Sequence, residues 1–298
     1  MKILRLYPEC KDYVWGGEKL KTKYGKRTDK SPCAESWELS FHKDGLTRLD
    51  DGITLMDSVT ASELGTRIAA FREFPMLIKL IDAKQNLSVQ VHPTDEYALE
   101  NENSQGKTEA WYIVDAEEGA GIYLGFKRDV TKEEYEGAIS DGTLTELLNF
   151  YEVKPGEFYF IPAGTVHAIG KGCLIYEIQQ SSNLTYRVYD YKRRDKDGNE
   201  RELHIEKALS VSSLERYEHR DRAIECKYFR AKRLAFEKAT LVASGESFHA
   251  VTCIRGGGEI DGEKINIGDS FFVPAGYGEY TLSGNMEIIL ADIPDEEK

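Results

Sequence analysis

An internal repeat with a fixed spacing of glycine and proline constrains the fold of this chain more than any other feature. In residues 156–167 a glycine is followed after five residues by proline, after one more by a second glycine, and after two more by His167. Residues 268–279 repeat this spacing but end on Glu279. Each copy predicts a turn, an apolar strand, and a Pro-x-Gly turn that delivers its last side chain to the start of the next strand. The repeat therefore predicts two related β-structures, of which only the first keeps an imidazole.

The length and composition are compatible with two globular domains. A chain of 298 residues is long enough for two β-structures with helical additions. Hydrophobic residues make up 41% of the sequence and charged residues 31%, which favours a buried core over disorder or a membrane protein. We place an approximate domain boundary between residues 1–220 and residues 221–298.

The charge balance limits the partners that we expect. A net charge of -13 argues against a surface that holds nucleic acid or an acidic membrane by charge, although a few local cations can still hold a small anion. The first residues lack a long apolar stretch and no later segment is apolar for about 18 residues, so we expect a cytoplasmic protein. Five widely spaced cysteines without a Cys-x-x-Cys pair favour reduced thiols over disulfides or a zinc cluster. The oligomeric state is not predicted.

The first domain is predicted to be an antiparallel meander interrupted by short helices. Residues 75–92 form an apolar run, a polar turn and an alternating segment, which predicts strand, turn and strand. Two further strands are expected at 109–114 and 122–126. Apolar residues recur near helical spacing in three segments: 61–71, 131–150 (two helices) and 204–214. The pattern predicts a mainly β fold, barrel or sandwich, with a small helical portion outside it.

Several side chains of the types that bind metals are expected to converge in this domain. Gln90 and His92 are two residues apart in a predicted strand, so both point to one face, which Ser88 shares. Glu109 opens the next strand, and His167 follows the Pro-x-Gly turn. Amide, imidazole and carboxylate donors suit a divalent ion, so we predict one metal ion per chain. The remaining histidines lack such a motif and are interpreted as core or surface groups: His42, His204, His219 and His249.

These motifs resemble those of known families. The repeat is similar to the second sequence motif of cupins, and 90–109 resembles their first motif, with Gln-x-His in place of the usual His-x-His. Three segments resemble the signatures of type I phosphomannose isomerases: Ser-Val-Gln-Val-His-Pro at 88–93, Gly-Lys-Thr-Glu-Ala-Trp at 106–111 and Pro-Ala-Gly-Thr-Val-His-Ala-Ile at 162–169. Matching segments at 13–17, 34–38 and 179–190 extend the similarity over nearly the whole chain, as in a short bacterial form.

The resemblance implies both a fold and a reaction. The fold is two cupin (jelly-roll) β-barrels, a catalytic one within 1–220 and a second one within 221–298 that lacks the metal ligands. The reaction interconverts mannose 6-phosphate and fructose 6-phosphate by proton transfer through an enediol. The cofactor is Zn²⁺, one per chain, with other divalent metals possible. The ligands carried over from the family are Gln90, His92, Glu109 and His167.

Two basic residues are expected to take part in the chemistry. Moving a proton between C1 and C2 requires a base, and Lys107 lies two residues before Glu109, where the resemblance also places one. A solvated strand-edge lysine is the alternative. Arg187 is expected to steady the developing oxyanion or to grip phosphate, with an exposed loop arginine as the alternative. The weaker candidates for phosphate contacts are Ser88, Lys79 and Lys84.

Other functions of a cupin fold remain open at this point, because the fold alone does not define chemistry. A dioxygenase needs redox-active iron and open coordination positions, which the glutamine ligand and the whole-chain resemblance disfavour. A non-catalytic carbohydrate-binding cupin would need neither Lys107 nor Arg187. An isomerase acting on glucose 6-phosphate differs only in the configuration at C2, which the sequence does not resolve.

Overall fold

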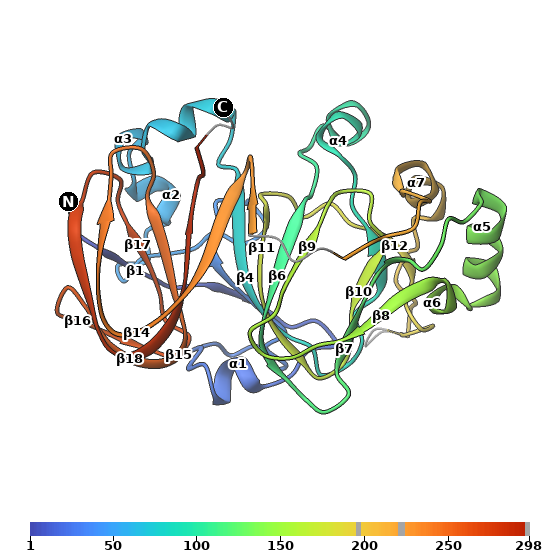
Figure 1. Cartoon of the computed structure of the whole chain (residues 1–298), viewed down its shortest axis with the longest axis horizontal. Helices are drawn as coiled ribbons and strands as arrows, with labels where there is room; N and C mark the ends of the chain where they lie inside the picture. Colours follow the sequence, from blue (N-terminus) through green and yellow to red (C-terminus); the bar gives the residue numbers. More distant parts are fainter. Residues whose placement is uncertain (195–197, 220–223, 296–298) are drawn as a thin grey trace. The chain divides into compact units, whose positions relative to one another are not determined.

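The fold is known from a computed structural model that describes all residues except 195–197, 220–223 and 296–298. Strands hold 42% of the residues and helices 16%, which confirms the prediction of a mainly β fold with a small helical portion. The chain divides into two compact units (Figure 1). The first unit consists of Met1–Asp12, Glu18–Leu80 and Ala223–Lys298. The second unit consists of Tyr13–Gly17 and Ile81–Arg222.

The first unit contains a seven-stranded antiparallel sheet in the order β1-β17-β15-β18-β14-β13, with β16 paired to β15. Its strands are β1 (Leu4–Leu6), β13 (Ile224–Cys226), β14 (Phe229–Ala243), β15 (His249–Ile260), β16 (Glu263–Asn266), β17 (Ser270–Val273) and β18 (Gly278–Asp292). The other elements of this unit are β2 (Glu9–Lys11), α1 (Lys19–Thr22), β3 (Glu35–Leu39), α2 (Leu55–Ser58), α3 (Ala61–Leu64) and the 3₁₀ helix η1 (Thr66–Ala70). The buried strand β4 (Met76–Asp82) continues into the second unit.

The second unit contains a five-stranded antiparallel ladder in the order β12-β5-β10-β7-β8 and a second ladder in the order β11-β6-β9. The first ladder consists of β5 (Val89–Val91), β7 (Gly121–Phe126), β8 (Leu148–Glu152), β10 (His167–Ile169) and β12 (Tyr186–Tyr189). The second ladder consists of β6 (Glu109–Ala116), β9 (Phe158–Ile161) and β11 (Cys173–Gln180). The helices are α4 (Asp95–Glu102), α5 (Lys132–Asp141), α6 (Leu144–Leu147) and α7 (Ile205–Val211).

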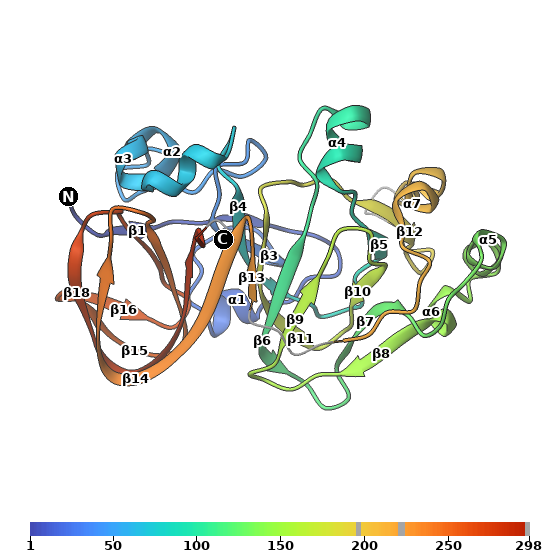
Figure 2. The same cartoon turned by 45° about the horizontal axis from the view of Figure 1, so that its top comes forward.

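The helices of the second unit lie outside its β-structure, as expected. Figures 1 and 2 show α5, α6 and α7 on the outer side of the five-stranded ladder. The core there is apolar and combines strand and helix side chains, among them Val89, Phe126, Tyr135 and Ala208. Burying one apolar face of each short helix against the ladder is what stabilises these helices, because helices this short are marginal alone.

The predicted repeat is confirmed in detail. Its glycines all require a positive φ that other residues rarely adopt: Gly156 (102°), Gly164 (87°), Gly268 (85°) and Gly276 (75°). Each copy encloses one short strand, β9 in the first copy and β17 in the second. The first copy ends on the first residue of β10 and the second copy ends within β18. The strands of the described residues form open ladders rather than closed barrels, so the pairing does not confirm two barrels.

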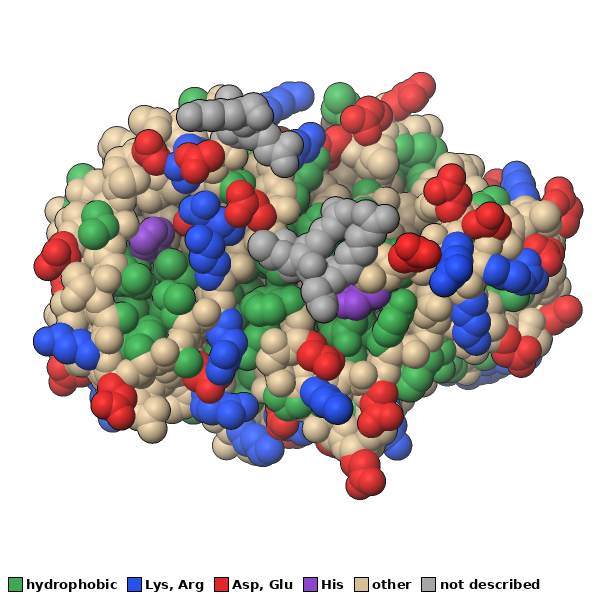
Figure 3. All heavy atoms as spheres, viewed as in Figure 1, with side chains coloured by type: hydrophobic (Ala, Val, Ile, Leu, Met, Phe, Trp, Pro, Cys, Tyr) green, Lys and Arg blue, Asp and Glu red, His purple; other side chains and the backbone are tan. Residues whose placement is uncertain are grey.

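Three further findings concern membranes, the surface charge and the cysteines. No helix within the described part of the chain is long and apolar enough to cross a membrane. Basic and acidic side chains are interspersed over the face drawn in Figure 3. All five cysteines are free thiols, which agrees with the expected reduced state.

Candidate metal centre and active site

Strand pairing brings the predicted ligands together inside the second unit. His167, the first residue of β10, lies directly opposite Gln90 of β5. His92 follows β5 immediately, and Glu109 opens β6 in the other ladder. Residues far apart in the sequence therefore meet at one place, because the ends of three strands carry them there.

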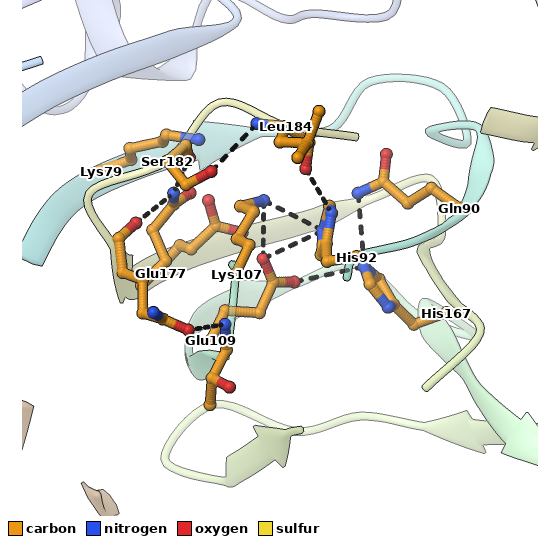
Figure 4. Close-up of polar contacts among 12 residues, drawn as sticks. Lys79, Gln90, His92, Lys107, Glu109, His167, Glu177, Ser182 and Leu184 are labelled. Carbon is orange, nitrogen blue, oxygen red and sulfur yellow. Dashed lines mark hydrogen bonds and ion pairs between the residues drawn. The ribbon is translucent and has the colours of Figure 1, made fainter. Parts of the chain in front are cut away.

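The ligand atoms lie close enough to share one ion. The nitrogen and oxygen donors of His92, Glu109 and His167 all lie within 4.8 Å of one another. Glu109 Oε2 is 3.4 Å from His92 Nε2, and Glu109 Oε1 is 3.3 Å from His167 Nε2. The Gln90 amide lies 3.3 Å from His167 Nε2, and Figure 4 shows these side chains pointing toward one another. In the described residues this is the one group of three such side chains with that geometry.

Both imidazoles are held in the form that binds a metal. His92 Nδ1 donates to the Leu184 carbonyl at 2.9 Å, and His167 Nδ1 donates to the Thr165 carbonyl at 2.8 Å. The Nε2 atoms therefore face Glu109 as lone-pair donors. Burial, followed by the charge of Lys107, lowers the pKa of His92 to about 3. Burial also lowers the pKa of His167 more than the Glu109 carboxylate raises it. Both rings are neutral near pH 7.

Glu109 is a fully buried carboxylate whose oxygens accept no well-aligned hydrogen bond from the described residues. Burial by itself raises the pKa of Glu109, but the charge of Lys107 holds that pKa well below its usual range. Lys107 is a cationic partner of Oε2, but the two imidazole lone pairs and the carboxylate also face one another, an arrangement that a divalent cation between them would stabilise. The amide, imidazole and carboxylate donors therefore fit a divalent metal ion.

Lys107 reaches the same site from the loop before β6. Its side chain is buried, with 4% of the residue exposed, and its Nζ lies 2.7 Å from Glu109 Oε2 and 3.0 Å from His92 Nε2. This burial excludes the alternative of a solvated strand-edge lysine. A primary amine next to the ligand atoms is well placed to exchange protons with a bound molecule.

Arg187 lies on the same ladder as the ligands. In β12 its backbone pairs with Gln90, and its Nη1 donates to the Glu202 carbonyl at 3.0 Å. Its Nε is buried without a hydrogen-bond acceptor among the described residues. Burial, followed by repulsion from Arg201, lowers the pKa of Arg187. The guanidinium thus retains a buried donor for a ligand.

The three weaker candidates lie in different environments. Ser88 is buried immediately before β5, two residues from Gln90. Lys84 is exposed in a bend, as its predicted turn implied. Lys79 is buried in β4, where its Nζ lies 3.9 Å from Glu35 Oε2 and above the Trp37 ring. Whether any of them contacts substrate stays a prediction.

The sequence assigned no role to two polar residues of β11. Glu177 is buried and accepts a hydrogen bond from Trp111 Nε1 at 2.9 Å, and Gln179 lies opposite Glu109 in the β6–β11 register. Their signal is a pair of polar residues at alternating positions in an otherwise apolar strand, which places both on one buried face.

Comparison with known proteins gives matches over both parts of the chain. Residues 3–122 match the model for the catalytic domain of type I phosphomannose isomerases, and residues 220–293 match the model for the cupin domain of mannose-6-phosphate isomerases. The mannose-6-phosphate isomerase ManA of Bacillus subtilis is 37% identical over 96% of this chain and 97% of its own length.

Solved structures show the same similarity in three dimensions. The mannose 6-phosphate isomerase of Bacillus subtilis superposes with a TM-score of 0.86 at 33% identity, covering 98% of this chain and 99% of that one. The apo form of the Salmonella typhimurium mannose 6-phosphate isomerase gives a TM-score of 0.76 at 18% identity, covering 98% of this chain and 99% of that one. At that identity the second match shows the fold alone.

Proposed function

The chain belongs to the type I phosphomannose isomerase family, and from this premise we propose that it interconverts mannose 6-phosphate and fructose 6-phosphate with the help of a bound metal ion. One observation carries the proposal. A buried lysine amine lies 2.7 Å from the carboxylate of a buried group of amide, imidazole and carboxylate donors. An aldose–ketose isomerase needs a proton carrier beside a site that stabilises negative charge on oxygen.

One metal ion per chain would be held by four ligands: Gln90, His92, Glu109 and His167. Zn²⁺ is the ion that the family resemblance implies, and neutral imidazoles with a carboxylate are ligands that it prefers. When bound, the metal supplies a Lewis acid that stabilises charge on the sugar oxygens. The amide of Gln90 can present its oxygen, since the two ends of an amide are assigned from its hydrogen bonds.

Lys107 would carry the proton between C2 of the aldose and C1 of the ketose through an enediol. Arg187 would steady the developing oxyanion or grip the phosphate with its unused Nε–H. Ser88, Lys79 and Lys84 remain candidates for phosphate contacts. Among them, Ser88 is closest in sequence to the ligands and shares the second unit with them.

We also keep the two cupin (jelly-roll) barrels and the division into 1–220 and 221–298 as proposals. The matched regions support them, because the catalytic-domain match lies within the first range and the cupin-domain match begins at residue 220. A barrel needs a closed circuit of paired strands, and the ladders of the described residues do not form one.

A coupled assay of the purified protein tests the function. The protein is assayed on mannose 6-phosphate and on glucose 6-phosphate, each with and without a chelator. We expect turnover of mannose 6-phosphate that the chelator removes. Turnover of glucose 6-phosphate alone would assign the other C2 epimer. Sugar-phosphate binding without turnover of either substrate would identify a carbohydrate-binding protein and reject the proposal.

A further inference from the structure

The segment that carries Lys107 has no regular secondary structure, yet its backbone is held at every residue from 105 to 108. Gln105 O accepts from Ser182 Oγ at 2.9 Å. Lys107 N donates to Pro93 O at 3.0 Å, directly after the ligand His92. A loop fixed in this way can hold a side chain as rigidly as a strand does, because its backbone groups have defined partners.

Asp95 and Gln180 form the part of this arrangement that brackets Lys107 on both sides. Gly106 N donates to Asp95 Oδ1 at 2.9 Å, and Thr108 N donates to Gln180 Oε1 at 2.7 Å. Gln180 Nε2 in turn donates to the same Asp95 oxygen at 2.8 Å. Because Thr108 N requires an acceptor, the Gln180 amide must turn its nitrogen toward Asp95. The hydrogen bonds therefore link the residues before and after Lys107 through two side chains.

The approach of the loop is too close for any other residue at position 106. A Cβ on Gly106 would lie 2.5 Å from Asp95 N and 2.5 Å from the Thr94 carbonyl carbon. Backbone lies on both sides of this contact, so no flexible side chain can give way. Gly106 thus allows the loop to come within hydrogen-bonding reach of Asp95.

We propose that Asp95 and Gln180 are positioning residues, which form a clamp (Asp95, Gly106, Thr108 and Gln180) that holds the Lys107 amine at the reacting carbons of the substrate. The inference rests on the proposed function, since the clamp matters to activity only if Lys107 carries the proton. Neither side chain reaches the metal ligands through these hydrogen bonds. A displacement of about 1 Å at a catalytic group can cost about 10²-fold in rate, which is the size of effect that the clamp prevents.

The test compares variants of the full-length, metal-loaded protein. Gln180→Met keeps the shape of the side chain but removes both of its side-chain hydrogen bonds. We expect kcat to fall about 10²-fold while KM stays within about 3-fold and metal content stays unchanged. Asp95→Ala should behave like Gln180→Met, and Asp95→Asn, which keeps an acceptor oxygen for Gly106 N, should recover most of kcat.

Two further measurements separate positioning from general damage. Combining Asp95→Ala with Gln180→Met should cost little more than either change alone, because both break one clamp. The matched control is Asn101→Ala on the exposed side of α4, where Asn101 Nδ2 donates to Tyr97 O. This control should leave kcat, KM and metal content as in the wild type.

Amide hydrogen exchange at Gly106 and Thr108 reports the clamp without any assay of activity. Exchange at both amides should be slow in the wild type and faster in Gln180→Met. Unchanged exchange in Gln180→Met, or faster exchange with unchanged kcat, would overturn the proposal. Failure of the wild type to isomerise either aldose phosphate would instead reject the proposed function, and the exchange data would still show whether the clamp exists.

Discussion

His92 and His167 show how single residues prepare the candidate centre. Each imidazole donates a hydrogen bond from Nδ1 to a main-chain carbonyl. The lone pair of its Nε2 therefore faces the Glu109 carboxylate. The buried setting keeps both rings neutral, which is the protonation state that a metal requires. The carboxylate stays ionised beside them because the charge of Lys107 offsets the effect of its burial.

His167→Ala removes one of two imidazoles from a site whose other donors are an amide and a carboxylate. Metal affinity should fall by at least about 10²-fold, while the far-ultraviolet circular dichroism stays like that of the wild type because the apolar core remains. Metal content after dialysis measures the effect. His249→Ala, which removes a hydrogen bond to Tyr280 in the first unit, is the control and should keep its metal. Wild-type metal content and activity in His167→Ala would show that His167 is structural.

Lys107→Met keeps the apolar stem of the side chain and removes the amine. If Lys107 carries the proton, kcat should fall by about 10³-fold or more while metal and sugar-phosphate binding persist. Exchange of the substrate C2 hydrogen with solvent should disappear together with turnover, since both need the enediol. A variant that keeps most of its turnover and only needs more substrate would make Lys107 a binding contact, and the base would then be another group at the site.

At the scale of elements, short helices depend on the ladder that they cover. α5 has few residues and buries Tyr135, Ala138 and Ile139 on one face. The Tyr135 ring meets the Phe126 ring of β7 edge-on at 5.2 Å between centroids. This aromatic contact attaches the helix to the same ladder that carries Gln90 and His167.

Tyr135→Ala should therefore lower the free energy of unfolding by about 3–5 kcal/mol, because it leaves a cavity in the core. Tyr135→Phe is the matched variant: it keeps the ring and loses only a long hydrogen bond from Ser212, so its cost should be at most about 1 kcal/mol. Urea denaturation followed by circular dichroism measures both values. Equal losses for the two variants would mean that the hydroxyl, rather than the ring, attaches α5.

For the whole molecule, the repeat predicts two β-structures but one metal centre. The second copy ends on Glu279, which is exposed, and His249 in the first unit hydrogen-bonds to Tyr280 instead. Within the described residues only His92, Glu109 and His167 form a group that could hold an ion. The cytoplasmic location and the absence of nucleic-acid or membrane partners stay predictions.

Elemental analysis of the purified protein should find about one equivalent of divalent metal per chain. Chelation should remove the metal and the isomerase activity together, and Zn²⁺ should restore both, because the site is made of the donors that zinc prefers. A second tightly held equivalent that survives His167→Ala would contradict the conclusion drawn from the repeat.

Local sequence patterns determined the repeat and several of the strands and helices. Alternation and apolar runs predicted β4 to β7, and helical spacing predicted α5, α6 and α7, since these signals depend on neighbours within a few residues. The Pro-x-Gly turns fixed the starts of β10 and β18 in the same way. The spacing of Gln90 and His92, with the family resemblance, predicted the ligand set and Lys107.

Only the tertiary structure decided what surrounds those residues. It placed Lys107 in a loop and buried it, and it supplied Leu184 O and Thr165 O as partners for the imidazoles. It also revealed Glu177 and the hydrogen bonds of Asp95 and Gln180. These contacts join residues 2 to 92 positions apart, and most of them join segments that meet only after folding. No local periodicity records such contacts, because burial and hydrogen-bond partners are properties of the packed strands.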